Sequence, residues 1–266
     1  MTSARLAVVC AVVVWSAVPA SAEPWYRGPR GKARVVHLSI ATAGGAAFVV
    51  SEAVFKSSLV ADDCRWCGPP GIDASVRNSL VWDDTGRAGW WSNATGYVSA
   101  PALSLGTVAV LGLVEDGTWG RLLDDTVPIL ETVAVSQVVT QLLKFAVARQ
   151  RPFVHYAGAA HSAETDDNMS FYSGHAALAF GVVTSAGMVL HWRGSRLEWL
   201  MWGAGMALSA TTGYLRIAAD KHYFTDVLTG SVIGVAAGLT IPRWMRDRPD
   251  LAIMPTGNGV AVVGAL

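Results

Sequence analysis

The stretch Phe224–Trp244, FTDVLTGSVIGVAAGLTIPRW, decides the fold class because it is long, apolar and rich in small residues. A helix needs about 20 predominantly apolar residues to cross a bilayer, and Gly, Ala, Ser and Thr let such helices approach closely. Five earlier stretches share this character: Val36–Phe55, Tyr97–Val114, Val127–Val147, Ala176–Trp192 and Trp199–Tyr214. We therefore predict an all-α six-helix bundle, and we favour a transmembrane bundle over a soluble one with tightly packed helices.

The composition favours the same class. Of 266 residues, 52% are hydrophobic and only 15% are charged, whereas a typical soluble domain carries about 25% charged residues. Lys+Arg and Asp+Glu balance at 20 each, so the net charge gives no reason to expect a nucleic-acid partner. Membrane lipids are the expected surroundings, and the sequence does not determine the oligomeric state.

The chain divides into three parts. Residues 1–22 resemble an export signal or an uncleaved N-terminal anchor, with Arg5, the apolar run Leu6–Val18 and a small-residue site at Ala20–Ala22. Either form sends the protein to the cell envelope. Residues 23–248 are predicted to form the helical domain. Residues 249–266 form a tail, in which Gly257–Gly259 followed by an apolar run predicts a short β-like hairpin.

A polar segment, Asp62–Arg87, separates the first two apolar stretches and contains a short amphipathic run, Ile72–Trp82. We interpret it as a loop outside the membrane that carries one surface helix. Cys64 and Cys67 lie in it with a spacing that suits redox activity, half a zinc site or a disulfide. No second Cys pair exists to complete a zinc site, so a structural disulfide is the favoured interpretation.

Basic residues stand at the end of the third apolar stretch. Lys144 and Arg151 are about two helical turns apart, which predicts that both lie on one helical face. Pro152 disfavours helical geometry at Arg151, so this arginine is expected where the helix gives way to a loop. Two cations at a helix end suit an anion, although such residues commonly anchor a helix at the membrane interface.

Two further motifs contain histidines. Ser173-Gly174-His175 precedes an apolar stretch, and a serine cap with free N–H groups at a helix start favours a bound phosphate. His222 and Asp226 are spaced i and i+4, which predicts a carboxylate beside an imidazole, with Arg216 nearby as a third cation. Such a pairing leaves one imidazole nitrogen available as a nucleophile or base. Taken singly, each motif also fits a capped helix or a surface ion pair.

Together the motifs are far more specific than any one of them. They read Lys144-x6-Arg151-Pro152, Ser173-Gly174-His175 and Arg216-x5-His222-x3-Asp226. This combination resembles the type 2 phosphatidic acid phosphatase superfamily, which also contains bacterial acid phosphatases and vanadium-dependent haloperoxidases. The motif match covers residues 144–226. Two positions depart from the family pattern, since Tyr172 stands where proline is usual and Leu215 where serine is usual.

The resemblance implies a role for each matched residue. His222 would attack phosphorus and form a phosphohistidine, Asp226 would hold its imidazole, and His175 would protonate the leaving group and then activate water. The groups implied to hold the phosphoryl oxygens are Lys144, Arg151, Arg216 and the backbone N–H groups around Ser173 and Gly174. The resemblance implies no metal and no cofactor, although vanadate or phosphate can occupy such a site.

The distribution of charge bears on the sidedness of the site. With six crossings, the loops that carry the motifs fall on one side, and arginines at 193, 196, 243, 246 and 248 fall on the other. The positive-inside rule then places the site outside the cytoplasm of a bacterial cell. A cleaved export signal would instead place the basic residues at 27–34 outside. The segment at 6–22 is then a reversed anchor, or one stretch does not cross, or the bundle is not fully embedded.

The leading hypothesis is a phosphatase acting on an amphiphilic lipid phosphate or isoprenoid diphosphate at the bacterial envelope. Three alternatives stay open: a soluble periplasmic acid phosphatase, a vanadium-dependent haloperoxidase and a non-catalytic membrane protein that binds an anion. Intramembrane Glu52 and Glu131 would support the last, since buried carboxylates in membranes are often functional. His37 and His191 are expected to be packing or interface residues. His155, His161, Glu164, Asp166 and Asp167 lie in a loop that could contact substrate.

Overall fold

The computed structural model describes residues 31–115, 119–158, 163–248, 251–256 and 259–264. The expectation of a mostly helical chain is confirmed. The long elements are α1 (Gly31–Ala53), α4 (Thr85–Asn93) continued by η1 (Ala94–Ser99) and α5 (Ala100–Glu115), α6 (Trp119–Val147), α8 (Gly174–Trp192), α9 (Glu198–Leu200) continued by η3 (Met201–Gly205) and α10 (Met206–Ala218), and α11 (Phe224–Asp247). The segment expected to be an export signal or anchor lies outside the described residues.

Helix α8 is the centre of the bundle, and α11 crosses it at very short range. Gly230, Gly234 and Gly238 of α11 face backbone atoms of α8, so that a side chain on any of them would collide with its neighbour. A Cβ at Gly238 would lie 2.8 Å from the carbonyl oxygen of Gly181 and 3.0 Å from the amide nitrogen of Ser185. The small residues of the Phe224–Trp244 stretch therefore set the distance between two helices that both begin at the candidate site.

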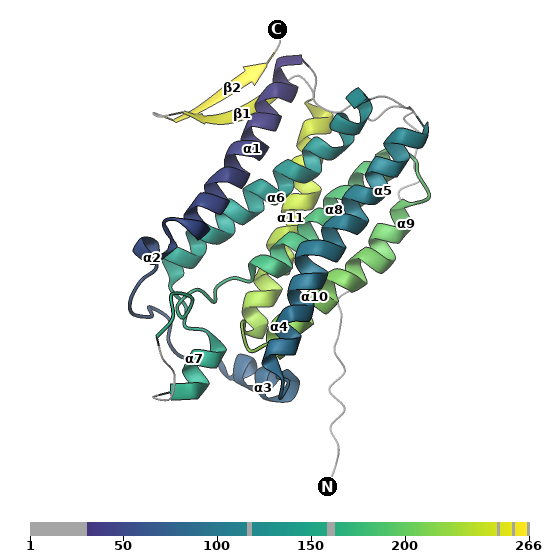
Figure 1. Ribbon diagram of the computed structural model, residues 1–266. Coiled ribbons are helices and arrows are strands. Elements are labelled where there is room, and N and C mark those ends of the chain that lie inside the picture. Colours follow the sequence, from purple (N-terminus) through teal and green to yellow (C-terminus); the bar gives the residue numbers. More distant parts are fainter. Residues whose placement is uncertain (1–30, 116–118, 159–162, 249–250, 257–258, 265–266) are drawn as a thin grey trace.

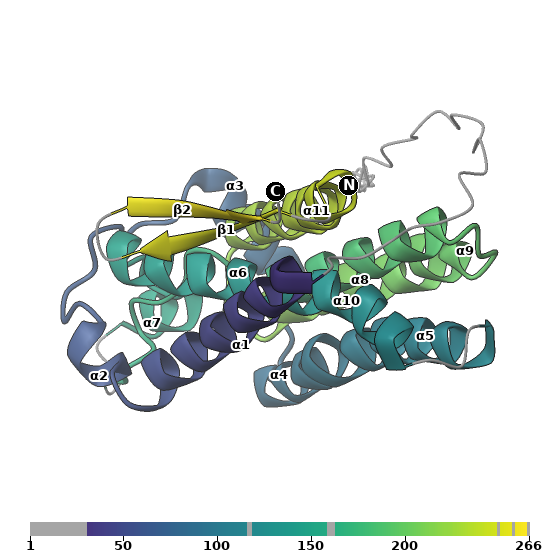
Figure 2. The ribbon, with the colours of Figure 1, turned by 90° about the horizontal axis from the view of Figure 1, so that it is seen from above.

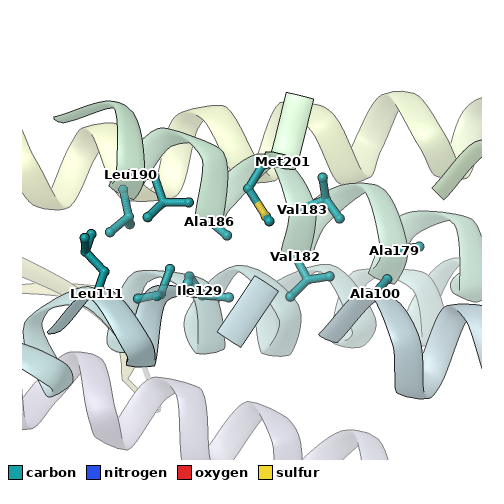
Figure 3. Packing of buried hydrophobic residues seen from close by; sticks show 11 residues of the cluster. Ala100, Leu111, Ile129, Ala179, Val182, Val183, Ala186, Leu190 and Met201 are labelled. Carbon is teal, nitrogen blue, oxygen red and sulfur yellow. The ribbon is translucent and has the colours of Figure 1, made fainter. Parts of the chain in front are cut away.

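An apolar core lies on the other flank of α8. Figure 3 shows Val182, Val183, Ala186 and Leu190 of this helix packed against side chains from neighbouring elements. The partners come from α5, α6 and η3 and include Ala100, Leu111, Ile129 and Met201. Every one of these side chains is almost completely buried, so this layer fixes the position of α8 inside the bundle.

Within the described residues, five helical segments are long and apolar enough to cross a membrane: Lys32–Ala53, Thr85–Leu113, Trp119–Val147, Gly174–Trp192 and Phe224–Asp247. The remaining predicted stretch, Trp199–Tyr214, is divided among α9, η3 and α10. Helix α10 itself has only 13 residues, so a count of six crossings stays a prediction. The second apolar helix begins earlier than expected, at Thr85, because Asp84 caps it through a hydrogen bond from the Arg87 amide.

The polar segment folds back onto the bundle. It contains α2 (Lys56–Leu59), the Cys64–Cys67 disulfide and α3 (Gly71–Leu80). Trp66 forms a short parallel bridge with Arg149, where the amide of Gln150 donates to the carbonyl of Trp66 (3.0 Å). In Figure 1, α2, α3 and the short helix α7 (Pro152–Ala157) gather at the lower end of the bundle, where α8 and α11 begin.

The tail forms a two-stranded antiparallel sheet from β1 (Leu251–Thr256) and β2 (Gly259–Gly264). Leu251 pairs with Gly264 and Thr256 with Gly259. Figure 1 places this sheet beside the start of α1, at the end of the bundle opposite α3 and α7, and in Figure 2 its two strands run side by side. The two strands of the tail therefore lie away from the candidate site.

Candidate active site

The first basic motif is bent rather than helical throughout. Helix α6 ends at Val147, and Ala148 has a positive φ of 46°. The expectation that Lys144 and Arg151 share one face of a continuous helix is therefore wrong. The bridge between Trp66 and Arg149 and the Pro152 that follows Arg151 hold the backbone extended here.

Lys144 lies at the start of α8, where the second motif begins. Its Nζ would be 3.9 Å from a Cβ placed on Gly174, so any larger residue there would crowd the ammonium group. Ser173 caps α8 by accepting from the Ala176 amide (3.4 Å), and Gln137 donates to the Gly174 carbonyl (3.2 Å). The first N–H groups of a helix have no acceptor within the helix. Lys144 and these N–H groups together form an anion-binding corner.

Arg151 lies beside this corner and is held by the loop that follows α7. Its Nε donates to the Asp166 carbonyl (2.7 Å), and its Nη2 pairs with the Asp166 carboxylate (3.3 Å). Lys56 of α2 pairs with the same carboxylate and with Glu52. Burial alone would raise the pKa of Asp166, but Arg151 and Lys56 outweigh it and lower the pKa. This loop, one of the segments expected near substrate, therefore forms a charged rim around the site.

Arg216, the third cation, comes from the last turn of α10. Its Nη1 donates to the hydroxyl of Ser92 (3.1 Å), and its Nε is buried without a partner among the described residues. A buried guanidinium with unused donors is costly unless a ligand completes its hydrogen bonds. Arg216 is therefore prepared to bind an anion.

His222 precedes α11 instead of lying on it, because Tyr223 is the N-cap and the helix begins at Phe224. The imidazole Nδ1 is 2.7 Å from the carbonyl oxygen of Ser170 and 3.9 Å from the Asp226 carboxylate. The carboxylate therefore lies beside the imidazole, as the spacing predicts, but 3.9 Å is too long for a hydrogen bond, because Asp226 is at the third helical position and His222 lies outside the helix.

The Ser170 carbonyl instead sets the tautomer of His222. A carbonyl oxygen can only accept, so Nδ1 carries the proton and Nε2 keeps its lone pair. Burial lowers the pKa of His222 well below the usual 6.5, and the nearby Arg216 and Arg151 lower it further. The imidazole is therefore neutral at pH 7, the state required of a nucleophile.

Asp226 supports this arrangement indirectly. Its carboxylate accepts from the Ser170 hydroxyl (2.6 Å), the Tyr223 amide (2.9 Å) and the Arg149 guanidinium (2.5 Å). It thereby fixes Ser170, whose carbonyl holds the imidazole of His222. Asp226 thus acts on the imidazole of His222 through the backbone of a neighbouring loop.

Arg149 and Asp73 are a buried pair that the motifs did not single out. Arg149 also donates to Asp73 on α3 (2.6 Å), and Asp73 accepts from the Thr225 amide (2.8 Å) and hydroxyl (2.7 Å). The guanidinium lies between two aromatic rings, 3.8 Å from the centre of the Trp66 ring and 4.3 Å from that of Tyr223. The polar segment is thus tied to the first turn of α11. The only sequence signal was an arginine two residues before Arg151.

His175 is in the first turn of α8, and its Nε2 is 2.7 Å from the Asn93 side-chain oxygen. The ring of Tyr97 lies 4.1 Å from the imidazole centre. Both partners come from the end of α4 and from η1, a segment of π-helix, and such segments are frequent at functional sites. The sequence around Asn93 matches a glycosylation-acceptor pattern, Asn93-Ala94-Thr95, which does not indicate a contact with His175.

The other candidate residues lie apart from this cluster or at its edge. His37 is buried and pairs with Glu131 (2.8 Å), and Glu52 pairs with Lys56 and accepts from Gln141 (2.8 Å). Both carboxylates thus take part in contacts between helices. The remaining histidines are His191, which is exposed and pairs with Glu198 (2.8 Å), His155, which contacts Gln150 (3.3 Å), and His161, which lies outside the described residues.

Three cations, a helix start and two buried imidazoles at one end of a helical bundle define an anion site of the kind used in phosphoryl transfer. Residues 125–250 match the family model described as the PAP2 superfamily. The resemblance inferred from the motifs is therefore confirmed for this part of the chain.

Two curated proteins match parts of the chain. Lipid A 1-phosphatase of Porphyromonas gingivalis is 35% identical over 79 residues, which cover 29% of this chain and 16% of that protein. Phospholipid phosphatase 2 of Bos taurus is 28% identical over 145 residues, which cover 43% of this chain and 48% of that protein. The chain thus spans less than half the length of either relative.

Two solved structures are also similar. The transmembrane PAP2 type phosphatidylglycerolphosphate phosphatase of Bacillus subtilis is 17% identical, with a TM-score of 0.48 over 79% of this chain and 92% of that one. LpxE of Aquifex aeolicus is 21% identical, with a TM-score of 0.44 over 64% of this chain and 92% of that one.

Proposed function

We propose that the protein is a metal-independent phosphatase that hydrolyses a lipid phosphate or isoprenoid diphosphate through a phosphohistidine at His222. The observation that carries this proposal is the convergence of Lys144, Arg151 and Arg216 on a neutral, oriented imidazole. An anion-binding protein without catalysis would use the cations but would gain nothing from a histidine whose tautomer is fixed for attack.

The first half-reaction begins with the lone pair on Nε2 of His222. This nitrogen attacks phosphorus, the N–P bond forms, and the bond to the leaving oxygen breaks with its electron pair on that oxygen. His175 supplies the proton that neutralises the leaving alkoxide. The hydrogen bond to the Ser170 carbonyl keeps the proton on Nδ1 of His222 and stabilises the positive charge that develops on the attacking ring.

The second half-reaction returns the enzyme to its starting state. His175, now neutral, takes a proton from water, and the resulting hydroxide attacks the phosphohistidine and releases His222 with inorganic phosphate. In both steps charge is concentrated on the equatorial phosphoryl oxygens. Lys144, Arg151 and Arg216 would hold these oxygens in the way that Mg²⁺ and its ligands do in other phosphotransferases.

The substrate class follows from the surroundings of the site. Five helical segments have the length and composition of membrane spans, and exposed Trp90, Trp91 and Tyr97 stand next to the site on α4 and η1. Exposed aromatic residues of this kind prefer the membrane–water interface. An amphiphilic substrate would place its phosphate at this level with its apolar chain in the membrane.

The sidedness is inferred from charge. Arg193, Arg196, Arg243 and Arg246 belong to the ends of α8 and α11 that lie away from the site. The positive-inside rule would place these ends in the cytoplasm and the site in the periplasm or exterior of a bacterial cell. The Cys64–Cys67 disulfide, which lies on the side of the site, suits that oxidising compartment.

The test measures inorganic phosphate released from lipid phosphates and isoprenoid diphosphates by the purified protein in EDTA. We expect release by the wild type, loss of release in His222→Ala, and no loss in the matched control His191→Ala, which removes an exposed imidazole. Activity that needs added metal, or that survives without His222, would refute the mechanism. Vanadate-dependent halide oxidation without phosphate release would instead identify a haloperoxidase.

A further inference from the structure

The wall formed by α4 and η1 contacts the edge of His175 that contains Nε2. The side-chain oxygen of Asn93 is 2.7 Å from Nε2, and a Cβ on Gly96 would lie 3.3 Å from the adjacent ring carbon, Cδ2. The same imaginary Cβ would lie 2.8 Å from Cγ2 of Thr212. The absence of a side chain at Gly96 thus allows η1 to approach both α8 and α10.

The contact with Asn93 determines which nitrogen of His175 carries a proton. An amide oxygen accepts and cannot donate, so Nε2 is protonated in the neutral ring and Nδ1 keeps its lone pair. Nδ1 lies on the opposite edge of the ring from Cδ2. Among the described residues, no side chain or backbone group hydrogen-bonds to it.

We propose that Asn93 is a positioning residue that fixes the Nε2–H of His175 and thereby assigns proton transfer to Nδ1. This inference rests on the proposed phosphatase function. In the first half-reaction Nδ1, which has taken up a proton from the bound phosphate monoanion, passes that proton to the leaving oxygen as the P–O bond breaks. In the second half-reaction the lone pair left on Nδ1 accepts a proton from water. The Nε2 proton remains on the bond to Asn93 throughout.

The position of Asn93 fits this role. It is the last residue of α4, is exposed at the site, and directly follows Ser92, which holds Arg216. Neighbouring residues of one helix end therefore hold the general acid and one phosphate-binding cation. The hydrogen bonds between His175 and Asn93 and between Arg216 and Ser92 would fix the position of the proton donor relative to the bound phosphoryl group.

A comparison of leaving groups tests the proposal. A poor leaving group, such as the alkoxide of an alkyl phosphate, needs a general acid, whereas the p-nitrophenolate of p-nitrophenyl phosphate departs readily without one. Asn93→Ala should lower kcat about 10- to 100-fold on the alkyl phosphate and less than about threefold on p-nitrophenyl phosphate. Asn93→Gln, which keeps a neutral amide oxygen as acceptor, should restore part of the loss.

Two variants calibrate the measurement. His175→Ala should show the same dependence on leaving group with a larger loss. Ser99→Ala is the matched control, because Ser99 lies on η1, is exposed, and among the described residues donates only to the carbonyl of Ala94 (3.0 Å). This variant should leave both rates unchanged. Equal losses of Asn93→Ala on both substrates, or no loss on the alkyl phosphate, would overturn the proposal.

A second measurement, of the ¹⁵N spectra of the histidine rings, tests the role of Asn93 without relying on activity. In protein labelled with ¹⁵N in its histidine rings, the Nε2 signal of His175, assigned by its disappearance in His175→Gln, should report a protonated, hydrogen-bonded nitrogen. Asn93→Ala should shift that signal, and an unshifted signal would overturn the assignment. A wild type that releases no phosphate from either substrate would refute the proposed function, while the ¹⁵N spectra would still decide the role of Asn93.

Discussion

Replacing Arg149 with methionine removes the cation that joins α3 to α11 and keeps an unbranched apolar side chain. The guanidinium is 1% exposed, and both of its carboxylate partners, Asp73 and Asp226, are fully buried. The variant therefore leaves two carboxylates in the interior without their common counter-charge. It also removes the cation from between the rings of Trp66 and Tyr223.

The magnitude follows from this burial. Removal of one partner from a buried ion pair typically lowers the free energy of unfolding by about 3–5 kcal/mol. Because an unpaired buried carboxylate has a raised pKa, the folded variant binds more protons than its unfolded chain at intermediate pH. Its stability should therefore increase as the pH falls. The difference in unfolding free energy between the variant and the wild type should therefore be smaller at pH 5 than at pH 8.

The consequence for catalysis comes through Ser170. Asp226 would lose its bond to Arg149, and the Ser170 carbonyl that orients His222 would be held less firmly. We expect kcat to fall by at least about tenfold, since misplacement of a reacting group by about 1 Å can cost about 100-fold.

The assay is thermal unfolding in detergent at both pH values, together with phosphate release. Arg65→Met is the matched control, because Arg65 is exposed and, within the part of the chain that the structure describes, its guanidinium donates only to the carbonyl of Ala146 (2.8 Å). If Arg149→Met had the same melting temperature as Arg65→Met and kept the wild-type kcat, the contacts of Arg149 with Asp73 and Asp226 would not position the nucleophile.

Three further predictions concern packing, pH and metal. Gly238→Ala should lower the free energy of unfolding by about 1–3 kcal/mol, because its Cβ would meet the Gly181 carbonyl at 2.8 Å, whereas Gly106→Ala meets nothing within 4 Å and should be neutral in the same melting assay. The lowered pKa of His222 keeps the nucleophile neutral in mild acid, so kcat/KM measured from pH 7 to pH 5.5 should show no inflection from this group near 6.5; such an inflection would contradict its burial beside the cations. Dialysis against EDTA should leave phosphate release unchanged, and recovery only with a divalent cation would contradict the three-cation site.

The long helices could be predicted from the sequence because each of them contains a long apolar run. The stretch from Phe224 to Trp244 also contained the small residues that allow α11 to lie against α8. The sequence was less informative about where helices end. Val147 ends α6 because the next residues bridge to Trp66, a contact between segments far apart in the chain that no local pattern reports.

The same distinction applies to the site. The motif residues were found because their types and spacings are local, yet one geometric inference drawn from spacing was wrong and another held only in part. The seven-residue step from Lys144 to Arg151 is not helical throughout, and the four-residue step from His222 to Asp226 crosses a helix start. Spacing predicts a shared face only where one helix is continuous.

The residues that the sequence did not reveal share one property: each acts on a motif residue from a distant part of the chain. Asn93 contacts His175 across 82 positions, and Asp73 contacts Arg149 across 76. The imidazole of His175 is bonded to an amide oxygen, and that of His222 to a backbone carbonyl. Neither acceptor is a carboxylate, so neither ring has a directly bonded negative charge that would raise its pKa. A site with three cations needs this arrangement, because a carboxylate on either ring would compete with the phosphate for the cations.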